Sequence, residues 1–210
     1  MNNKIKKILK KKNKSKIVCL TAYSKNIAEV VDDHADIVLV GDSLGSVLYN
    51  YDTTRKVSLN MMIEHTKSAR MGVKKSLLVI DLPYNTYRNK SEALKNSKKA
   101  IKETKCDAVK VEGGTKVKEI VKHLVKNRIP VLGHIGITPQ TTKGKFISKG
   151  KNEAEKRKLF KDAKDLEQSG AFGIVLECIY SDVSKKITNL INIPTIGIGA
   201  SVNCDGQVLV

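Results

Sequence analysis

Short apolar runs alternate with longer amphipathic stretches along almost the whole chain. Each run is rich in Val, Ile and Leu and lacks the regular polar alternation of a half-exposed sheet, which is typical of strands buried on both faces. We therefore predict a series of parallel strands separated by helices. The predicted strands are residues 17–23, 37–43, 76–82, 108–111, 131–137, 173–178, 195–199 and 205–210.

The stretches between these strands have the spacing and the end signals of amphipathic helices. We predict helices over residues 24–31, 59–71, 91–104, 117–126, 152–169 and 181–190. Residues 46–57 lack such periodicity and are predicted to be a loop. Near the start, Ile5, Ile8 and Leu9 lie at helical spacing within a basic stretch, which predicts a short helix across one end of the domain.

About eight such strands favour a closed (β/α)8 barrel over an open doubly wound sheet. A dinucleotide-binding fold is disfavoured because no GxGxxG follows the first strand, and the chain has no GxxxxGK[ST] loop either. We divide the chain into a basic N-terminal segment, residues 1–16, and a single barrel domain, residues 17–210. The eighth unit is expected to be cut short, with part of the barrel wall uncovered, because the sequence stops inside the last predicted strand.

The net charge is +18 and the sequence pI about 9.7, which raises the question of a nucleic-acid partner. The lysines are spread over every predicted helix, aromatic residues make up only 4%, and Trp is absent. This pattern favours solvated helix faces over a nucleic-acid surface, which combines clustered basic and aromatic side chains. No apolar run approaches the roughly 20 residues of a membrane helix, so no membrane partner is expected. The four cysteines form no C-x-x-C pair, which fits a reducing cytoplasm.

Several predicted strands end in polar side chains that can bind a metal or move a proton. In a parallel barrel the active site lies at these carboxyl ends, so the side chains are expected to meet there. Lys110 alternates with Val109 and Val111 and would point into the barrel, which is costly without an anionic partner. The candidates are Asp42, Ser43, Asp81, Lys110, Glu112, His134 and Glu177.

Three or four carboxylates in one pocket repel each other unless a positive charge lies between them. An all-oxygen ligand set suits Mg²⁺ or a similar hard cation, and a zinc site of cysteines or histidines is not supported. Simpler roles remain open at this point: Asp42 could cap a helix, Asp81 could belong to a turn, and His134 could be a core histidine.

The other histidines, His34, His65 and His123, are interpreted as structural or solvated. The basic loop at residues 143–151 is either a mobile lid or an ordinary solvated loop.

In this order, the segments IVCLTAYS, VGDSLG, YDTT, MIEHTK, DLPY, AVKVEGG, GHIGITPQ, IVLEC, IPTIGIGA and CDGQVLV resemble the 3-methyl-2-oxobutanoate (ketopantoate) hydroxymethyltransferase family. The resemblance covers residues 17–210, and its motifs are specific in combination although each alone is weak.

The resemblance implies a TIM barrel of the phosphoenolpyruvate/pyruvate type. It also implies transfer of a hydroxymethyl group from 5,10-methylenetetrahydrofolate to 3-methyl-2-oxobutanoate, giving 2-dehydropantoate in pantothenate and coenzyme A biosynthesis through a Mg²⁺-stabilised enolate. By motif match, Asp42 and Asp81 would hold the metal, with Glu112 in its shell directly or through water. Ser43, Asp81, Lys110 and His134 would bind the oxo acid, and Glu177 would be the base. The family also implies a cytoplasmic homo-oligomer, commonly a decamer.

Two alternative functions remain open from the sequence. A Mg²⁺-dependent 2-oxo acid lyase or mutase of the same barrel group would share the metal carboxylates but need no folate. An inactive, shortened barrel that binds other molecules through its basic surface would show salt-dependent nucleic-acid binding without turnover.

Overall fold

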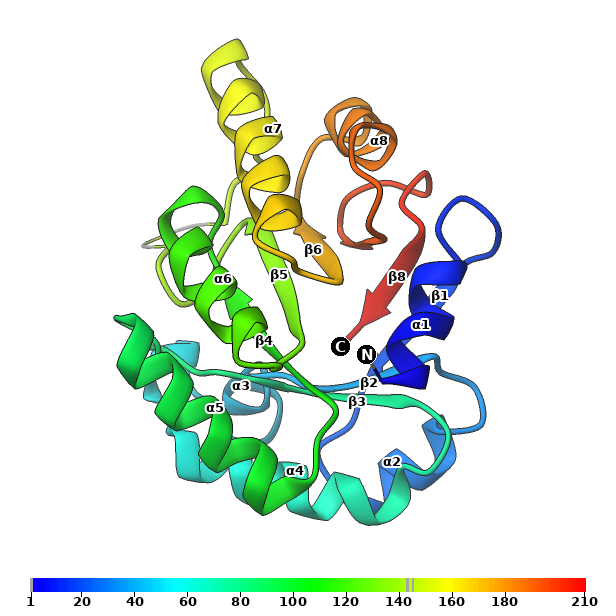
Figure 1. The fold of residues 1–210 in the computed structure, drawn as a ribbon, viewed down its shortest axis with the longest axis vertical. Helices are drawn as coiled ribbons and strands as arrows, with labels where there is room; N and C mark the ends of the chain where they lie inside the picture. Colours follow the sequence, from blue (N-terminus) through cyan, green and yellow to red (C-terminus); the bar gives the residue numbers. More distant parts are fainter. Residues whose placement is uncertain (1, 143, 145) are drawn as a thin grey trace.

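Eight short parallel strands pair in chain order, and the last returns to the first, so that the sheet closes into a barrel. The computed structural model describes residues 2–142, 144 and 146–210 (Figure 1). The strands are β1 (Ile17–Thr21), β2 (Ile37–Val40), β3 (Leu77–Asp81), β4 (Ala108–Glu112), β5 (Val131–Gly136), β6 (Gly173–Glu177), β7 (Thr195–Ile198) and β8 (Gly206–Leu209). The predicted barrel is therefore confirmed, with strand ends one to three residues inside the predicted limits at most positions.

Most of the helices lie outside the barrel, as the periodicity predicts. They are α1 (Asn3–Lys10), α2 (Lys25–Val31), α3 (Leu44–Tyr49), α4 (Leu59–Gly72), α5 (Lys90–Thr104), α6 (Lys118–Lys126), α7 (Glu153–Gln168) and α8 (Ser181–Leu190), with 3-10 turns η1 (Thr54–Lys56) and η2 (Thr115–Val117). Asn89 and Asn152 cap α5 and α7 by accepting a backbone N–H three residues on, as an N-cap side chain should.

The loop prediction for residues 46–57 is wrong, because α3 and η1 occupy most of it. The apolar residues Val47, Leu48 and Tyr49 of α3 are exposed, so their pattern does not show the buried stripe that identifies a helix. Asn50 ends α3 in the left-handed conformation, and Thr53 caps η1 through its hydroxyl. Both short elements are set by local turn chemistry and not by amphipathic periodicity.

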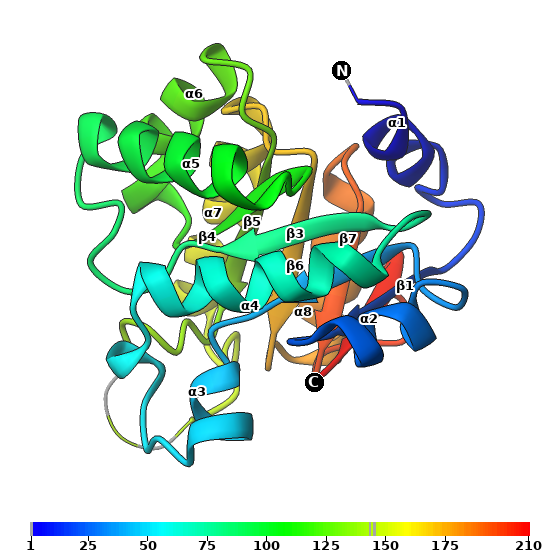
Figure 2. The same ribbon diagram turned by 90° about the horizontal axis from the view of Figure 1, so that it is seen from below.

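The N-terminal helix closes the barrel at the end where the strands begin. Ile5 and Ile8 of α1 are buried in one cluster with Ile17, Ile37 and Leu77, the first residues of β1, β2 and β3. Figure 2 shows α1 far from α3, which follows the carboxyl end of β2. The predicted helix across one end of the domain is thus confirmed, and the opposite end stays available for the polar side chains.

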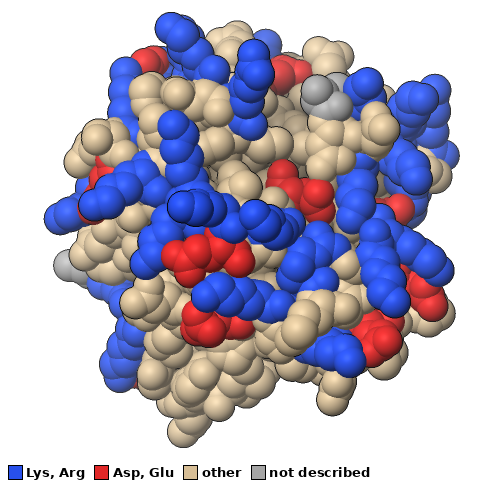
Figure 3. Space-filling model, turned by 60° about the horizontal axis from the view of Figure 1, so that its bottom comes forward, with Lys and Arg blue, Asp and Glu red and all other residues tan. Residues whose placement is uncertain are grey.

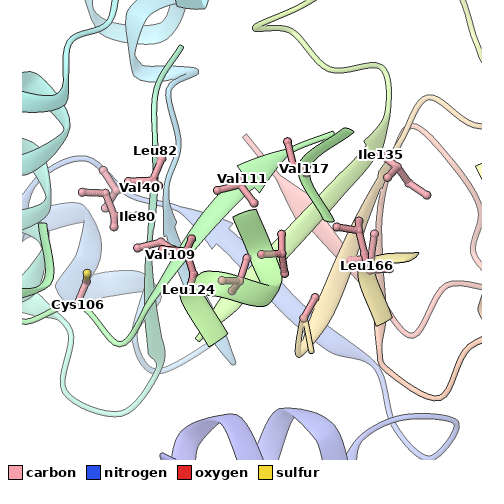
Figure 4. Close-up of a cluster of buried hydrophobic side chains, with 14 of the residues drawn as sticks. Val40, Ile80, Leu82, Cys106, Val109, Val111, Val117, Leu124, Ile135 and Leu166 are labelled. Atoms are coloured by element: carbon pink, nitrogen blue, oxygen red, sulfur yellow. The ribbon is translucent and has the colours of Figure 1, made fainter. Parts of the chain in front are cut away.

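A second apolar layer joins the barrel to its helices and fixes which side chains face inward. Val109 and Val111 of β4 pack in this layer with Leu124 of α6 and Leu166 of α7 (Figure 4). Since side chains alternate along a strand, Lys110 between the two valines must point into the barrel, as predicted.

The eighth strand pairs with both neighbours, β7 and β1, so the barrel closes. Val18 of β1 and Leu209 of β8 are nevertheless 41% and 67% exposed on the outer wall. The expected uncovered apolar surface is therefore present at this position.

The surface charge is distributed and does not form one stripe. On the face shown in Figure 3, Lys and Arg side chains cover most regions, with Asp and Glu between them. Some are paired along a single helix, such as Lys158 with Asp162 and Lys161 with Asp165 in α7. Within the part of the chain that the structure describes, no helix is long and apolar enough to cross a membrane.

One buried carboxylate organises the connection between α4 and β3. Asp32, at the end of α2, accepts backbone N–H groups from Lys74, Lys75 and Ser76 at 2.8–3.2 Å. Burial alone would raise the pKa of Asp32, but these three donors favour the charged form and lower its pKa to about 2.

We expect Asp32→Asn to lower the free energy of unfolding by about 1–3 kcal/mol at pH 7, because the amide cannot accept the same set of donors. The folded-state pKa lies below the unfolded value, so the contribution is present above pH 4 and is lost as pH falls towards 2. Urea unfolding at several pH values measures this. Asp33→Asn, at an exposed neighbour that pairs only with Lys75, is the matched control. The role given to Asp32 would be contradicted if both variants lost the same free energy of unfolding, or if Asp32→Asn were still less stable than the wild type at pH 2.

Candidate active site

The predicted site residues converge at the carboxyl end of the barrel. The strand register brings Asp81 opposite Lys110, and Glu112 opposite His134. Asp42 and Ser43 follow β2 directly, and Glu177 is the last residue of β6. The seven side chains therefore come from the carboxyl ends of the adjacent strands β2 to β6 or from the residues just after them, and unrelated caps and turns do not account for this shared location.

Lys110 is the cation at the centre of this group. Its Nζ lies 2.8 Å from Asp81 Oδ1 and 3.9 Å from Glu112 Oε1, and the residue is only 5% exposed. Burial by itself would lower the pKa of Lys110, but Asp81, Glu112 and Asp42 raise it above the usual lysine range. Lys110 therefore stays charged and compensates its buried acidic neighbours.

Asp42 is held against the same group by two hydrogen bonds. Its backbone N–H donates to Asp81 Oδ2 at 3.0 Å, and its Oδ2 accepts from Gln140 Nε2 at 2.8 Å. Burial, followed by the Asp81 carboxylate, raises the pKa of Asp42 above its usual range, while Lys110 opposes that shift. This carboxylate is therefore the member of the group that gains most from an additional cation.

His134 lies between two carboxylates, with Nδ1 3.5 Å from Glu112 Oε1 and Nε2 3.0 Å from Glu177 Oε2. Neither contact has hydrogen-bond geometry, and each becomes an ion pair when the ring is protonated. Burial and Lys110 would lower the pKa of His134, but the two carboxylates raise it to about 9. For Glu112, burial would raise the pKa, and His134 leads the neighbours that hold it below its usual value.

A cavity of about 510 Å³ opens beside Ser43 and Glu177. Ser43 Oγ lies 2.9 Å from the hydroxyl of Tyr23, so β1 also contributes to the position of this serine. The Glu177 side chain keeps 17% of its surface exposed, whereas His134 beside it is almost fully buried. Glu177 can thus reach a bound molecule while its ion pair holds it in place.

The close approach of β5 to the backbone of Glu177 requires a glycine at position 136. Gly136 of β5 has φ +100°, and a Cβ there would lie 2.1 Å from the backbone oxygen of Glu177. Cys178, directly after Glu177, has φ +49°, the left-handed conformation that turns the chain away from β6. Close strand contact on one side and a tight turn on the other define where Glu177 sits.

Gln140 is the main site residue that sequence reasoning missed. It is 1% exposed; its side chain donates to Asp42 and to the Leu82 carbonyl, and its backbone N–H donates to Glu112 Oε2. Tyr87 donates to Gln140 Oε1. The signal was available, because Gln140 ends the GHIGITPQ motif, but a residue in a loop after a strand gave no reason to expect burial.

The remaining histidines agree with their structural interpretation. His65 is within hydrogen-bond distance of the Tyr23 carbonyl through Nδ1 and the Tyr49 hydroxyl through Nε2, and it packs edge-on against the Tyr49 ring. His34 is exposed and His123 half-buried on α6. The predicted lid or loop at residues 143–151 lies partly outside the described residues; Lys149 pairs with Ile179.

The oxygen-rich group fits a hard divalent cation held by few protein ligands. Asp81 Oδ1 has an ion-pair partner but no hydrogen-bond donor, and Asp42 has a raised pKa. Over residues 2–142, 144 and 146–210, no three or more His, Cys, Asp or Glu side chains form a ready-made metal cage. Mg²⁺ commonly takes only one or two carboxylates and completes its shell with water and substrate, so Asp42 and Asp81 suffice.

We expect Lys110→Met to destabilise the fold by about 3–5 kcal/mol at pH 8, because three buried carboxylates lose their cation. Without Lys110 their folded-state pKa values rise, so stability should fall as pH increases from about 4 and recover on acidification. Urea unfolding at pH 5 and pH 8, with chelator present, tests this. Lys116→Met, a lysine outside this group, is the control. A loss that does not depend on pH would contradict the charge-balance explanation.

Comparison with known proteins agrees with the motifs. Residues 2–210 match the family model described as ketopantoate hydroxymethyltransferase. A protein of Pelagibacter ubique (strain HTCC1062) named 3-methyl-2-oxobutanoate hydroxymethyltransferase is 63% identical over 210 residues, covering 100% of this chain and 81% of that protein. A protein of the same name from Rhizobium etli is 48% identical over 197 residues, covering 92% of this chain and 72% of its own.

Solved structures support the fold. A 2,3-dimethylmalate lyase of the PEP mutase/isocitrate lyase superfamily matches with a TM-score of 0.70 at 13% identity, covering 100% of this chain and 78% of that one. A phosphonopyruvate hydrolase in complex with oxalate and Mg²⁺ matches with a TM-score of 0.67 at 10% identity, covering 94% and 72%. At such identities only the shared TIM-barrel fold follows. The match over almost the whole chain and the 63% identity show that this protein belongs to the ketopantoate hydroxymethyltransferase family.

Proposed function

We propose that this protein transfers a hydroxymethyl group from 5,10-methylenetetrahydrofolate to 3-methyl-2-oxobutanoate and forms 2-dehydropantoate. The name of the family and of its relatives supports the transfer itself. The single structural observation that carries the proposal is Glu177, a partly exposed carboxylate at the cavity, 3.0 Å from His134 and on the same rim as the Lys110 group. Folate as donor, Mg²⁺ and the enolate route are the parts that need testing.

In this proposal Lys110, Ser43 and His134 contribute to binding the oxo acid. Lys110 and protonated His134 supply positive charge, and the Ser43 hydroxyl, placed by Tyr23, supplies a hydrogen bond. Asp81 fixes Lys110 and shares the metal with Asp42, while Glu112 keeps Lys110 and His134 charged. Gln140 ties Asp42 to Glu112 and so keeps the acidic group together.

Glu177 would remove the proton from C3 of the oxo acid as general base. Mg²⁺, when bound by Asp42 and Asp81, would act as a Lewis acid on the keto oxygen and make that proton more acidic. In the donor, water would hydrolyse the methylene group: both C–N bonds break, the water oxygen stays with the carbon as formaldehyde, and N5 and N10 of tetrahydrofolate take the two protons. The carbanion would then attack the carbon of formaldehyde, and the alkoxide formed would take back the proton held by Glu177, which restores the enzyme.

A lyase or mutase acting on a 2-oxo acid is the second candidate. The similarity to a dimethylmalate lyase and to a phosphonopyruvate hydrolase favours it only at the level of the fold. The requirement for a one-carbon donor separates the two reactions. Homo-oligomeric assembly and a cytoplasmic location stay predictions from the family resemblance.

We expect Glu177→Gln to reduce both hydroxymethyl transfer and donor-independent exchange of the C3 proton in D₂O by about 10²–10⁴-fold, the range for loss of a general base. NMR follows the exchange, and product formation follows the transfer. Glu153→Gln, at an exposed residue at the start of α7 that pairs only with Lys156, is the matched control. Exchange at the wild-type rate in Glu177→Gln would exclude Glu177 as the base. Turnover without folate would favour the lyase or mutase.

Chelation of divalent ions should abolish both exchange and transfer, and added Mg²⁺ should restore them. Asp81→Asn should require a higher Mg²⁺ concentration for half-maximal exchange, because a carboxylate ligand becomes neutral. Titration of the exchange rate with Mg²⁺ measures this. Undiminished activity in EDTA would remove the metal from the proposal.

A further inference from the structure

The cavity beside Ser43 and Glu177 contains one cation for which the roles above give no use. Arg55 belongs to η1, a segment that the sequence pattern predicted to be loop, and lines the cavity together with Thr53 and Thr54. The hydroxyl of Thr54 is buried without a hydrogen-bond partner. η1 therefore contributes polar residues, Thr53, Thr54 and Arg55, to the lining of this cavity.

The guanidinium of Arg55 is held in one orientation. Its Nε donates to the backbone oxygen of Gln140 at 2.8 Å, and its Cζ lies 5.1 Å from the centre of the Tyr84 ring. A guanidinium has five N–H donors, and the contact to Gln140 uses one of them. Among the described residues, no hydrogen-bond acceptor is recorded for the terminal nitrogens, whose planar arrangement suits two parallel hydrogen bonds to a carboxylate.

Two other basic side chains close to this part of the chain have acidic partners. Arg88 pairs with Glu92 at 2.7 Å, and Lys56, next to Arg55, pairs with Asp52 at 2.7 Å. In the described ranges, no carboxylate oxygen lies within 4.0 Å of the Arg55 guanidinium. The charge of Arg55 is thus uncompensated at a position where a ligand can enter.

The charges deeper in the site explain why such a group is useful. Four acidic side chains, Asp42, Asp81, Glu112 and Glu177, lie deeper in the site around the buried Lys110. A substrate carboxylate that approaches is repelled by each of these groups that is ionised. A fixed cation at the entrance lowers this repulsion and orients the substrate.

We propose that Arg55 binds a substrate carboxylate at the mouth of the active-site cavity. The carboxylate belongs either to the oxo acid or to the glutamate part of the one-carbon donor, two sources with the same chemistry. This proposal rests on the proposed function, since it assigns a contact within the same site. It makes Arg55 a substrate-binding residue that acts on affinity more than on the chemical step.

Three variants test whether Arg55 recognises a substrate charge or only holds Gln140 in place. Arg55→Gln removes the charge, whereas Arg55→Lys keeps the charge but loses the Nε hydrogen bond to Gln140 and the guanidinium contact with the Tyr84 ring. Arg157→Gln makes the same chemical change at an exposed position of α7. We expect Arg55→Gln to raise KM for one of the two substrates about 10- to 100-fold, the value of a lost charge-assisted pair. Arg55→Lys should recover part of this loss, kcat should change much less, and Arg157→Gln should match the wild type.

Binding measurements identify the source of the carboxylate without turnover. Calorimetric titration with 3-methyl-2-oxobutanoate and, separately, with tetrahydrofolate gives each Kd for the wild type and for Arg55→Gln. If the glutamate part is the partner, the variant should lose affinity for tetrahydrofolate, and a tetrahydropteroyl amide, which has neither glutamate nor a free carboxylate, should bind both proteins equally. If the oxo acid is the partner, its Kd should rise instead. Either result supports the proposal.

The proposal is overturned if Arg55→Gln binds both ligands with wild-type affinity. It is also overturned if Arg55→Lys and Arg55→Gln lower kcat equally with KM unchanged, because Arg55 would then only hold Gln140 in place. These outcomes are distinct from failure of the proposed function, in which the wild-type protein itself shows no transfer with Mg²⁺ and donor present.

Discussion

The charge balance around Lys110 is the interaction on which the site depends. A lysine inside a barrel is tolerated only because Asp81 and Glu112 lie within reach of its Nζ, and these carboxylates are tolerated only because Lys110 is there. Such a group gains little stability over an apolar core of the same size. The presence of this buried charged group therefore indicates that concentrated charge has a function at this end of the barrel.

The barrel separates stability from chemistry along its axis. At the end where the strands begin, Ile5 and Ile8 of α1 fill the interior with apolar contacts. At the other end, the inward positions of β3 to β6 carry charged groups, and Gln140 closes the network from the loop after β5. Backbone hydrogen bonds and the outer helices hold both ends together. The free-energy cost of burying charged groups at the polar end is therefore offset by apolar burial at the other end.

Family membership and site geometry support the same conclusion from independent directions. The motifs that match the family carry the residues that meet at the rim, and the structure adds Gln140, the last residue of one motif, and Arg55, which follows another. Membership alone does not assign roles to residues, and geometry alone does not name a substrate. Together they define a hydroxymethyltransferase proposal in which the base, a metal ligand and a substrate contact have separate experimental tests.

The sequence by itself determined the strand and helix alternation, the closed barrel and the polar strand ends, because these follow from local periodicity and strand direction. Lys110 could even be oriented from its two valine neighbours. Only the tertiary structure decided which loop residues join the site, since burial of Gln140 and the fixed plane of Arg55 depend on contacts between segments more than 80 residues apart. The protonation of His134 was likewise decided in three dimensions, because it requires Glu112 and Glu177 on neighbouring strands.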